Sequence, residues 1–479
     1  MSVGLELAEK FREKISSDFS KNHKQALGQY LTPAELAIFA VKFFDLNKFP
    51  CIKLLDPGAG SGSLTCSFIE NFQIENINVK AVELDNKILP YLSDALSHYN
   101  FVEIINEDFI EFGIKSILQG DKYTHIFTNP PYIKVNKNFI ESKVGKTCFD
   151  SHNLYSIFLE ISIELLEDNG EIVAIIPRSF CNGKLFSKFR SKLLDICSVE
   201  KIHLFLERDD VFKDDKVLQE NIIIHLVRKK QSDVVEISHS HGISLKNFEK
   251  YSVPFNRVIL ENDKNRVIHI PLSSSSLAIF NFKYSFKDLE IDISTGPIVD
   301  FRSIDKLSEI YGESYIPLIY TNHLKDFNLN WVDGLHKKKS FLKIDNAFKS
   351  YFKEGYYVAI RRFSSKEQDR RIHAYLVDTS IIGYTKGVTF ENHLNVMHCN
   401  KSSLDFLLAK GLVIYLSSTL VDEYVRQFSG STQINVTDLK YIPYPSKDVL
   451  INLGKLWDGT SYLSQDEIDY FLSTINVMG

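Results

Sequence analysis

The four consecutive residues Asn129, Pro130, Pro131 and Tyr132 have side chains suited to binding a planar amino group. They follow an apolar run at 123–128, so the sequence predicts a loop at the end of a buried strand. The asparagine oxygen can accept a hydrogen bond from an amino group, and the prolines stiffen the loop so that a main-chain carbonyl can accept a second. The tyrosine offers a flat face for stacking. A Pro-Pro turn that merely ends the strand is the structural alternative.

A glycine-rich turn at 56–63 follows an earlier apolar run and contains Asp56, Gly58 and Gly60. Glycines there let the backbone pass close to a ligand. The spacing fits neither a Walker phosphate loop nor the usual dinucleotide fingerprint. Glu83 ends the next predicted strand, roughly 20 residues further on, where a carboxylate can bind a ribose diol.

Asp108 and Phe109 follow a third predicted strand at 102–105. Asp108 can accept a hydrogen bond from an adenine amino group while the Phe109 ring packs on the base. Taken singly, Glu83 and Asp108 fit surface or turn carboxylates equally well. Their order along an alternating strand–helix pattern favours a shared role in binding a ligand.

In type and order, these segments resemble the motifs of the S-adenosylmethionine-dependent adenine-N6 DNA methyltransferases of the gamma group. In that group the cofactor motifs precede the catalytic motif, and the recognition domain comes last. Residues 28–33, which include Tyr30 and Thr32, resemble the segment that lines the methionine end of the cofactor. Residues 152–155 resemble the segment after the catalytic loop. The resemblance covers about residues 24–230.

The resemblance implies that the chain is the modification enzyme of a restriction-modification system, which methylates N6 of an adenine flipped out of duplex DNA. Asn129 and the Pro130 carbonyl are then expected to accept the two N6 hydrogens, while Tyr132 stacks on the base and Pro131 completes the catalytic loop. Phe212 resembles a family phenylalanine that contacts the flipped base. The resemblance implies no metal, and it assigns cofactor binding to Tyr30, Thr32, Asp56, Gly58, Gly60, Glu83, Asp108, Phe109 and Asn129.

Three alternative activities remain open at this stage. A protein-glutamine N5 methyltransferase uses the same loop, but the long segment after residue 291 argues against it. An N4-cytosine DNA methyltransferase more often has serine at the position of Asn129. A modification subunit that needs a separate specificity subunit would lack the recognition domain that this chain carries in cis.

The elements expected to position these residues are strands that alternate with helices. The predicted strands are 52–55, 79–83, 102–105, 124–128, 171–176, 199–205 and 221–227. We therefore expect an α/β fold with a Rossmann-like, mostly parallel, seven-stranded methyltransferase sheet. No helix is evident before the last strand, which is therefore expected to be antiparallel. The expected domains are a catalytic domain at 1–235, a linker with irregular strands at 236–290, and an α+β target-recognition domain at 291–479.

Residues 292–302 and 428–445 resemble the opening and closing segments of a target-recognition domain. Between them, Arg361, Arg362 and Asn395 have side chains suited to phosphate and base-edge contacts. With Lys134 near the catalytic loop, and with Tyr132 and Phe212, they are the residues predicted to contact double-stranded DNA.

The net charge of −5 is unusual for a DNA-binding protein and leaves only local basic clusters for that role. No apolar run reaches about 18 residues, so no membrane span is expected. The cysteines lack metal-binding spacing and fit free thiols in a reducing cytoplasm. We expect a monomeric cytoplasmic enzyme from a bacterium or archaeon, with or without a cognate restriction endonuclease acting on the same site.

Overall fold

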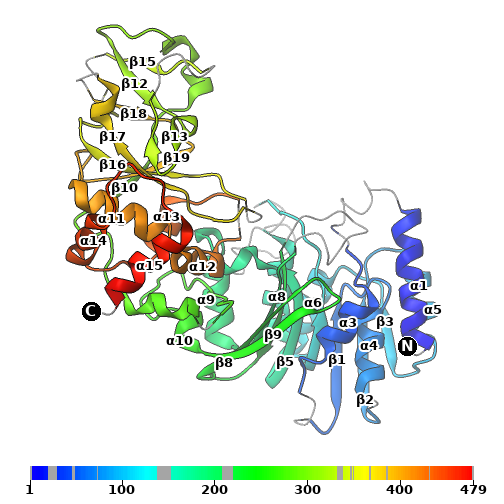
Figure 1. The fold of residues 1–479 in the computed structure, drawn as a ribbon. Coiled ribbons are helices and arrows are strands. Elements are labelled where there is room, and N and C mark those ends of the chain that lie inside the picture. The colour runs from blue at the N-terminus through cyan, green and yellow to red at the C-terminus, as the bar shows by residue number, and fades with distance from the viewer. Residues whose placement is uncertain are drawn as a thin grey trace. The chain divides into compact units, whose positions relative to one another are not determined.

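The computed structural model describes residues 3–476 except 20–27, 29, 46–48, 73, 137–152, 208–219, 274, 332–337, 346–347, 349, 366–367, 384–386 and 431. The chain divides into two compact units, Met1–Leu272 and Ser273–Gly479 (Figure 1). Within the described ranges, every helix is too short or too polar to span a bilayer.

A nine-stranded mixed sheet forms the centre of the first unit, in the order β3-β2-β1-β4-β5-β7-β6-β8-β9. Its strands are β1 (Ile52–Pro57), β2 (Ile77–Val82), β3 (Val102–Ile105), β4 (Tyr123–Thr128), β5 (Leu166–Pro177), β6 (Ser198–Phe205), β7 (Asn221–Val227), β8 (Val234–His241) and β9 (Lys246–Pro254). β1 to β5 pair in parallel, and β7 is antiparallel to both β5 and β6. Each of the seven predicted strands is present and β7 is antiparallel, but the predicted number of strands in the sheet is wrong, because β8 and β9 extend it from seven strands to nine.

Two groups of helices pack on this sheet. They are α1 (Val3–Asp18), α3 (Ala34–Val41), α4 (Ser63–Phe72) and α5 (Leu89–Leu96), and separately α6 (Phe109–Gln119), α8 (Leu154–Leu165) and α9 (Ser187–Ile196). Shorter helices are α10 (Phe255–Val258), η1 (Arg178–Cys181) and η2 (Lys184–Phe186). Every residue of β4 and β7 is buried, as expected for central strands covered on both faces.

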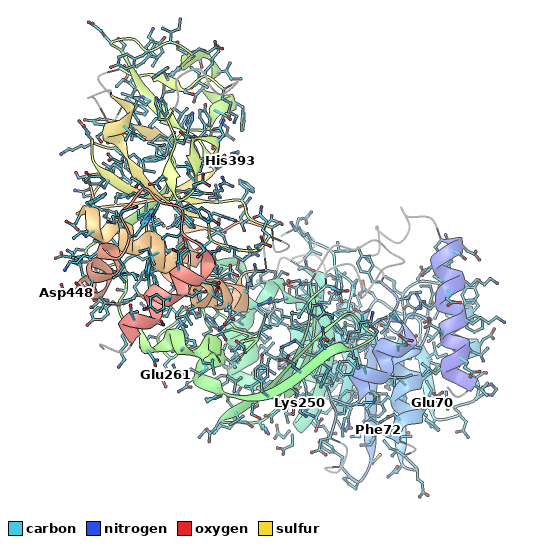
Figure 2. All side chains as sticks on the ribbon, in the orientation of Figure 1. Glu70, Phe72, Lys250, Glu261, His393 and Asp448 are labelled. Atoms are coloured by element: carbon cyan, nitrogen blue, oxygen red, sulfur yellow. The ribbon has the colours of Figure 1, made fainter. Side chains whose placement is uncertain are left out.

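The predicted linker at 236–290 is wrong in its first part. β8 pairs in parallel with β6, β9 pairs with β8, and the first unit extends to residue 272 rather than 235. β9 is an almost wholly exposed edge strand rich in lysine and glutamate; its Lys250 is labelled in Figure 2. Such a strand lacks the alternation of apolar and polar residues from which strands are predicted. Its formation depends on backbone pairing with β8, which the local sequence does not reveal.

The second unit has two sheets with helices near its C-terminus, in agreement with the predicted α+β content. The larger sheet has the order β10-β19-β16-β17-β14-β13 and the smaller β11-β15-β12-β18. The strands are β10 (Asp292–Thr295), β11 (Leu307–Ser308), β12 (Tyr315–Ile319), β13 (Leu324–Lys325), β14 (Asn328–Leu329), β15 (Phe341–Lys343), β16 (Tyr356–Arg361), β17 (Ala374–Asp378), β18 (Thr389–Phe390) and β19 (Leu394–His398). The helices are η4 (Ser275–Asn281), η5 (Asp300–Arg302), η6 (Ile304–Lys306), η7 (Thr321–His323), η8 (Thr379–Ile382), α11 (Phe406–Leu416), α12 (Thr419–Phe428), α13 (Val436–Lys440), α14 (Lys447–Lys455) and α15 (Gln465–Asn476).

Candidate active site

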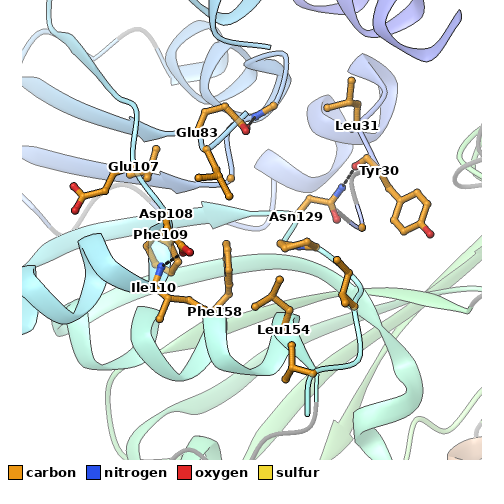
Figure 3. A pocket seen from close by; sticks show the side chains of 18 of the residues that line it. Tyr30, Leu31, Glu83, Glu107, Asp108, Phe109, Ile110, Asn129, Leu154 and Phe158 are labelled. Atoms are coloured by element: carbon orange, nitrogen blue, oxygen red, sulfur yellow. Dashed lines mark hydrogen bonds between the residues drawn. The ribbon is translucent and has the colours of Figure 1, made fainter. Parts of the chain in front are cut away.

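A cavity of about 360 Å³ lies at the carboxyl ends of the central strands of the first unit (Figure 3). This edge is where ligands bind in open α/β sheets, because the loops after parallel strands meet there. Seven of the nine residues predicted to bind the cofactor line the cavity: Tyr30, Gly58, Gly60, Glu83, Asp108, Phe109 and Asn129. Chain folding therefore brings together motifs that are separated by about 100 residues.

Glu83 ties the glycine-rich turn to the end of β2. Its Oε2 accepts a hydrogen bond from the Gly60 amide at 2.8 Å, and its Oε1 accepts one from the Asp85 amide at 2.8 Å. Burial raises the pKa of the Glu83 carboxyl, and the two amide donors oppose that rise. Each carboxylate oxygen has a further lone pair, so Glu83 can hold the turn and still accept from a ligand.

Gly58 and Gly60 form a part of the cavity wall that has no side chains. Their φ angles are +76° and +58°, a region that L-residues with side chains rarely adopt. A Cβ atom added at Gly60 would lie 2.7 Å from Leu31 Cδ2. The backbone is therefore free to approach a ligand closely at this turn.

Asp108 and Phe109 give the cavity a polar group beside an aromatic wall. Asp108 is the N-cap of α6, and its Oδ1 accepts a hydrogen bond from the Ile110 amide at 2.9 Å. The Phe109 ring packs against the Phe158 ring with the centroids 4.7 Å apart. A carboxylate next to a flat apolar surface suits a purine ring with an exocyclic amino group.

The Asn129 amide is held in one orientation. Its Nδ2 donates to the Tyr30 carbonyl at 2.8 Å and to Thr32 Oγ1 at 3.1 Å, and its Oδ1 accepts from the Tyr132 hydroxyl at 2.8 Å. A carbonyl oxygen can only accept, so the nitrogen must be the atom facing Tyr30. Thr32 borders a smaller adjoining pocket that Tyr30 and Asn129 share.

Tyr132 differs from its predicted role as an open stacking surface. Its side chain is buried, and its hydroxyl donates to Asn129 Oδ1 and to the Ile175 carbonyl at 3.1 Å. The ring packs beside Tyr30, with the centroids 5.4 Å apart, and beside Tyr155. In this conformation the ring fills the protein interior, so stacking on a base requires it to turn outward.

Asp56 does not reach the cavity, which corrects the prediction that it contacts the cofactor. Its side chain is fully buried and accepts a hydrogen bond from Thr65 Oγ1 at 2.7 Å. Burial, with a smaller contribution from the nearby Glu83 charge, raises the pKa of Asp56 to about 7. We therefore assign Asp56 a structural role in supporting the glycine-rich turn.

Of the residues predicted to contact DNA, Asn395 is in a structural role instead. It is fully buried, its Nδ2 donates to the Ile434 carbonyl at 2.8 Å, and its Oδ1 accepts from Thr295 Oγ1 at 3.1 Å. Both ends of the amide are therefore used in joining strands. Lys134 lines the cavity of the first unit, and Phe212 lies outside the described residues.

Among the apolar residues of the cavity wall that sequence reasoning missed are Leu154 and Phe158, both on α8. They are spaced i and i+4, so they lie on one face of that helix. That spacing within an apolar helix following the catalytic loop was the available signal. It could not show which face of so apolar a helix meets the cavity.

A family model matches part of the first unit, and two relatives match nearly the full length of this chain. The family described as Eco57I restriction-modification methylase matches residues 29–212. Type II methyltransferase M.BsuBI of Bacillus subtilis is 40% identical across 98% of this chain and 97% of that protein. Type II methyltransferase M.PstI of Providencia stuartii is 34% identical across 98% of this chain and 96% of that protein.

A solved structure shares the fold at low sequence identity. The type IIG restriction endonuclease BpuSI is 16% identical and aligns with 98% of this chain and 68% of its own, with a TM-score of 0.51. The likeness indicates a mixed α/β unit with a large mixed sheet, joined to further sheets.

Proposed function

Because this chain belongs to the type II DNA methyltransferases of restriction-modification systems, we propose that it methylates N6 of adenine in duplex DNA, with S-adenosylmethionine as the donor. The observation that carries the choice of an amino group is the Asn129 amide, and asparagine rather than serine at this position favours adenine over cytosine. Its nitrogen is used by Tyr30 and Thr32, so the group that meets an amino substrate is its oxygen, which accepts from the Tyr132 hydroxyl in this structure. The order of the motifs supports the gamma group, and the sheet supports a Rossmann-like methyltransferase unit.

The cavity residues fit S-adenosylmethionine part by part. Glu83 suits the ribose diol, and Asp108 with the paired Phe109 and Phe158 rings suits the adenine. The side-chain-free wall at Gly58 lets the backbone approach. When bound, S-adenosylmethionine supplies a methyl group on a positively charged sulfur, which is a good leaving group.

The protein's own contribution is to position the amine. Adenine N6 is conjugated with its ring and is a poor nucleophile, so two acceptors outside the ring plane favour a more tetrahedral nitrogen. Asn129 Oδ1 and the Pro130 carbonyl are those acceptors, and no strong general base is needed. Catalysis then depends mainly on orientation, which can supply several kcal/mol of barrier lowering.

Tyr132 connects base binding to this amide. If its ring turns outward to stack on the extruded base, its hydroxyl leaves Asn129 Oδ1, and that oxygen gains room for the substrate amine. Stacking offsets part of the cost of flipping, which is roughly a few kcal/mol. Pro131 lines the cavity and restricts the loop between these two residues.

We assign methyl transfer to the first unit and sequence recognition to the second. Arg361 and Arg362 on the second unit, and Lys134 and Phe212 on the first, are the proposed DNA contacts. A separate cognate endonuclease is the proposed partner in the cell.

The test is methyl transfer from tritiated S-adenosylmethionine to unmethylated genomic DNA, followed by digestion and separation of the nucleosides. We expect label in N6-methyldeoxyadenosine, and about a hundredfold slower labelling with an Asn129→Ala variant that still binds the cofactor. Label in N4-methyldeoxycytidine would show that cytosine, and not adenine, is the methylated base. Label only in a release-factor protein would favour glutamine methylation, and no label at all would indicate a missing subunit.

A further inference from the structure

Four segments of the second unit converge around Arg362. Its amide donates to the His393 carbonyl at 2.8 Å, and its carbonyl accepts from the Ile434 amide at 2.8 Å. The Ser364 amide donates to the Thr432 carbonyl, and the Asn392 amide donates to the Ile298 carbonyl at 2.8 Å. The surface formed by Arg362, Phe363, His393 and Gln433, here called the 362 surface, is therefore held by backbone bonds between separate segments.

The guanidinium of Arg362 is incompletely paired. Its hydrogen-bond partners are the Asn392 carbonyl at 3.4 Å and the Gln433 and Asn435 side-chain oxygens at 3.5 Å, all at the long limit for such bonds. Its Nε is buried without a partner, and among the described residues no carboxylate forms an ion pair with it. These contacts orient the group while leaving its charge and much of its donor capacity unused.

Two partly exposed rings belong to residues whose backbones adjoin that of Arg362, Phe363 in the chain and His393 through its carbonyl. Phe363 is 46% exposed, and its ring meets the His393 ring edge-on with the centroids 4.9 Å apart. The His393 side chain is 44% exposed, and its Nδ1 lies 3.1 Å from Glu391 Oε1 (His393 is labelled in Figure 2). Because the buried Glu391 carboxylate also accepts from the His393 amide at 3.0 Å, it holds the histidine in place with Nδ1 toward the carboxylate.

Arg361, which precedes Arg362 in the chain, makes different contacts. Its guanidinium lies over the Tyr375 ring, 5.1 Å from the centroid, and its Nη2 donates to the Leu324 carbonyl at 3.2 Å. It therefore packs against its own unit. The Nε of Arg361 is buried without a partner, as is that of Arg362. The two adjacent arginines therefore differ in their surroundings, since Arg361 is stacked on the buried Tyr375 ring, and Arg361 is a matched control for Arg362.

We propose that Arg362 is a specificity-determining residue that reads a guanine of the recognition sequence through the major groove, within the 362 surface. An arginine fork matches the O6 and N7 acceptors of guanine, the amide of Gln433 can read an adjacent base, and an apolar ring such as Phe363 suits a thymine methyl group. The inference rests on the proposed function, since it concerns how that enzyme selects its DNA.

The first experiment is modified-base sequencing of genomic DNA from a host that lacks adenine methylation and expresses wild type, R362Q or R361Q. Wild type should methylate a motif that contains guanine. R362Q should lose preference at one guanine by about tenfold or more, because a bidentate contact discriminates on that order. R361Q should keep the motif and lower methylation uniformly. An unchanged motif with R362Q, a wild-type motif without guanine, or relaxation by R361Q alone would overturn the proposal.

A second measurement covers the case in which R362Q is inactive. Duplexes with 7-deazaguanine at each guanine in turn lose the N7 acceptor, and binding is measured with the wild-type chain and with R362M, which keeps an unbranched side chain without donors. One substitution should weaken wild-type binding several-fold and affect R362M much less. Equal sensitivity of both proteins, or no sensitive guanine, would overturn the assignment. If wild type methylates no adenine at all, the proposed function fails, which is a separate result.

Discussion

Thr32→Val tests whether the orientation of the Asn129 amide governs methyl transfer. The hydroxyl of Thr32 accepts one of the two Nδ2 hydrogens at 3.1 Å, and the Tyr30 carbonyl accepts the other at 2.8 Å. Valine keeps the shape of the side chain and removes only the acceptor. Asn129 is then held by one bond at its nitrogen end instead of two.

The expected magnitude follows from that single bond. A neutral hydrogen bond contributes about 0.5–1.5 kcal/mol net, and a buried donor without a partner costs about 1–3 kcal/mol. If loss of this bond raises the free-energy barrier to methyl transfer by about 1 kcal/mol, the rate falls about fivefold. The Tyr30 bond remains, so the loss should be well below that of Asn129→Ala.

The assay is the single-turnover rate of methyl transfer at saturating S-adenosylmethionine and DNA, with cofactor affinity measured separately by calorimetry. Thr32→Ser keeps the hydroxyl and should restore most of the rate. In the Asn129→Ala background, Thr32→Val should have no further effect, because the group it positions is gone. An unchanged rate in a folded variant, or an equal loss in the Asn129→Ala background, would refute this reasoning.

Asn129→Ala should lower turnover by about a hundredfold, because positioning is lost, while calorimetry shows cofactor affinity nearly unchanged. Glu83→Gln should reduce both cofactor affinity and thermal stability: a glutamine amide can accept from only one of the two backbone donors through its oxygen, and the donor left unpaired costs about 1–3 kcal/mol. The pKa of Asp56 is raised from 3.8 to about 7, so the folded state binds the extra proton and its stability falls as pH rises through this range. In urea unfolding, the free energy of unfolding of Asp56→Asn relative to wild type should therefore increase up to about pH 7 and stay constant above it. A difference between the two proteins that does not depend on pH would contradict this. Tyr132→Phe should lower stability by about 1 kcal/mol through loss of the bonds to Asn129 and the Ile175 carbonyl, yet methylate better than Tyr132→Ala, which also loses the ring; equal rates would exclude a stacking role.

The sequence by itself determined which residues gather at the cavity. Glu83, Asp108 and Asn129 each follow a short apolar run, and such runs become buried parallel strands whose carboxyl ends meet at one edge. The positions of Glu83, Asp108 and Asn129 at strand ends are therefore local properties. They were readable from residue type and spacing before any contact was known.

Tertiary structure alone decided how each side chain is used. Tyr132 and Asn395 have the types expected at a binding surface, but both are buried and hydrogen-bonded by residues distant in sequence. Asp56 is buried and accepts a hydrogen bond from Thr65. The exposed strand β9 forms through its pairing with β8, and its sequence has no apolar pattern typical of a strand. Arg361 and Arg362 are the same residue type at adjacent positions, and only their packing distinguishes a guanidinium stacked on a tyrosine ring from one held by long hydrogen bonds to a neighbouring loop. Burial and donor use depend on long-range contacts, which a local pattern does not encode.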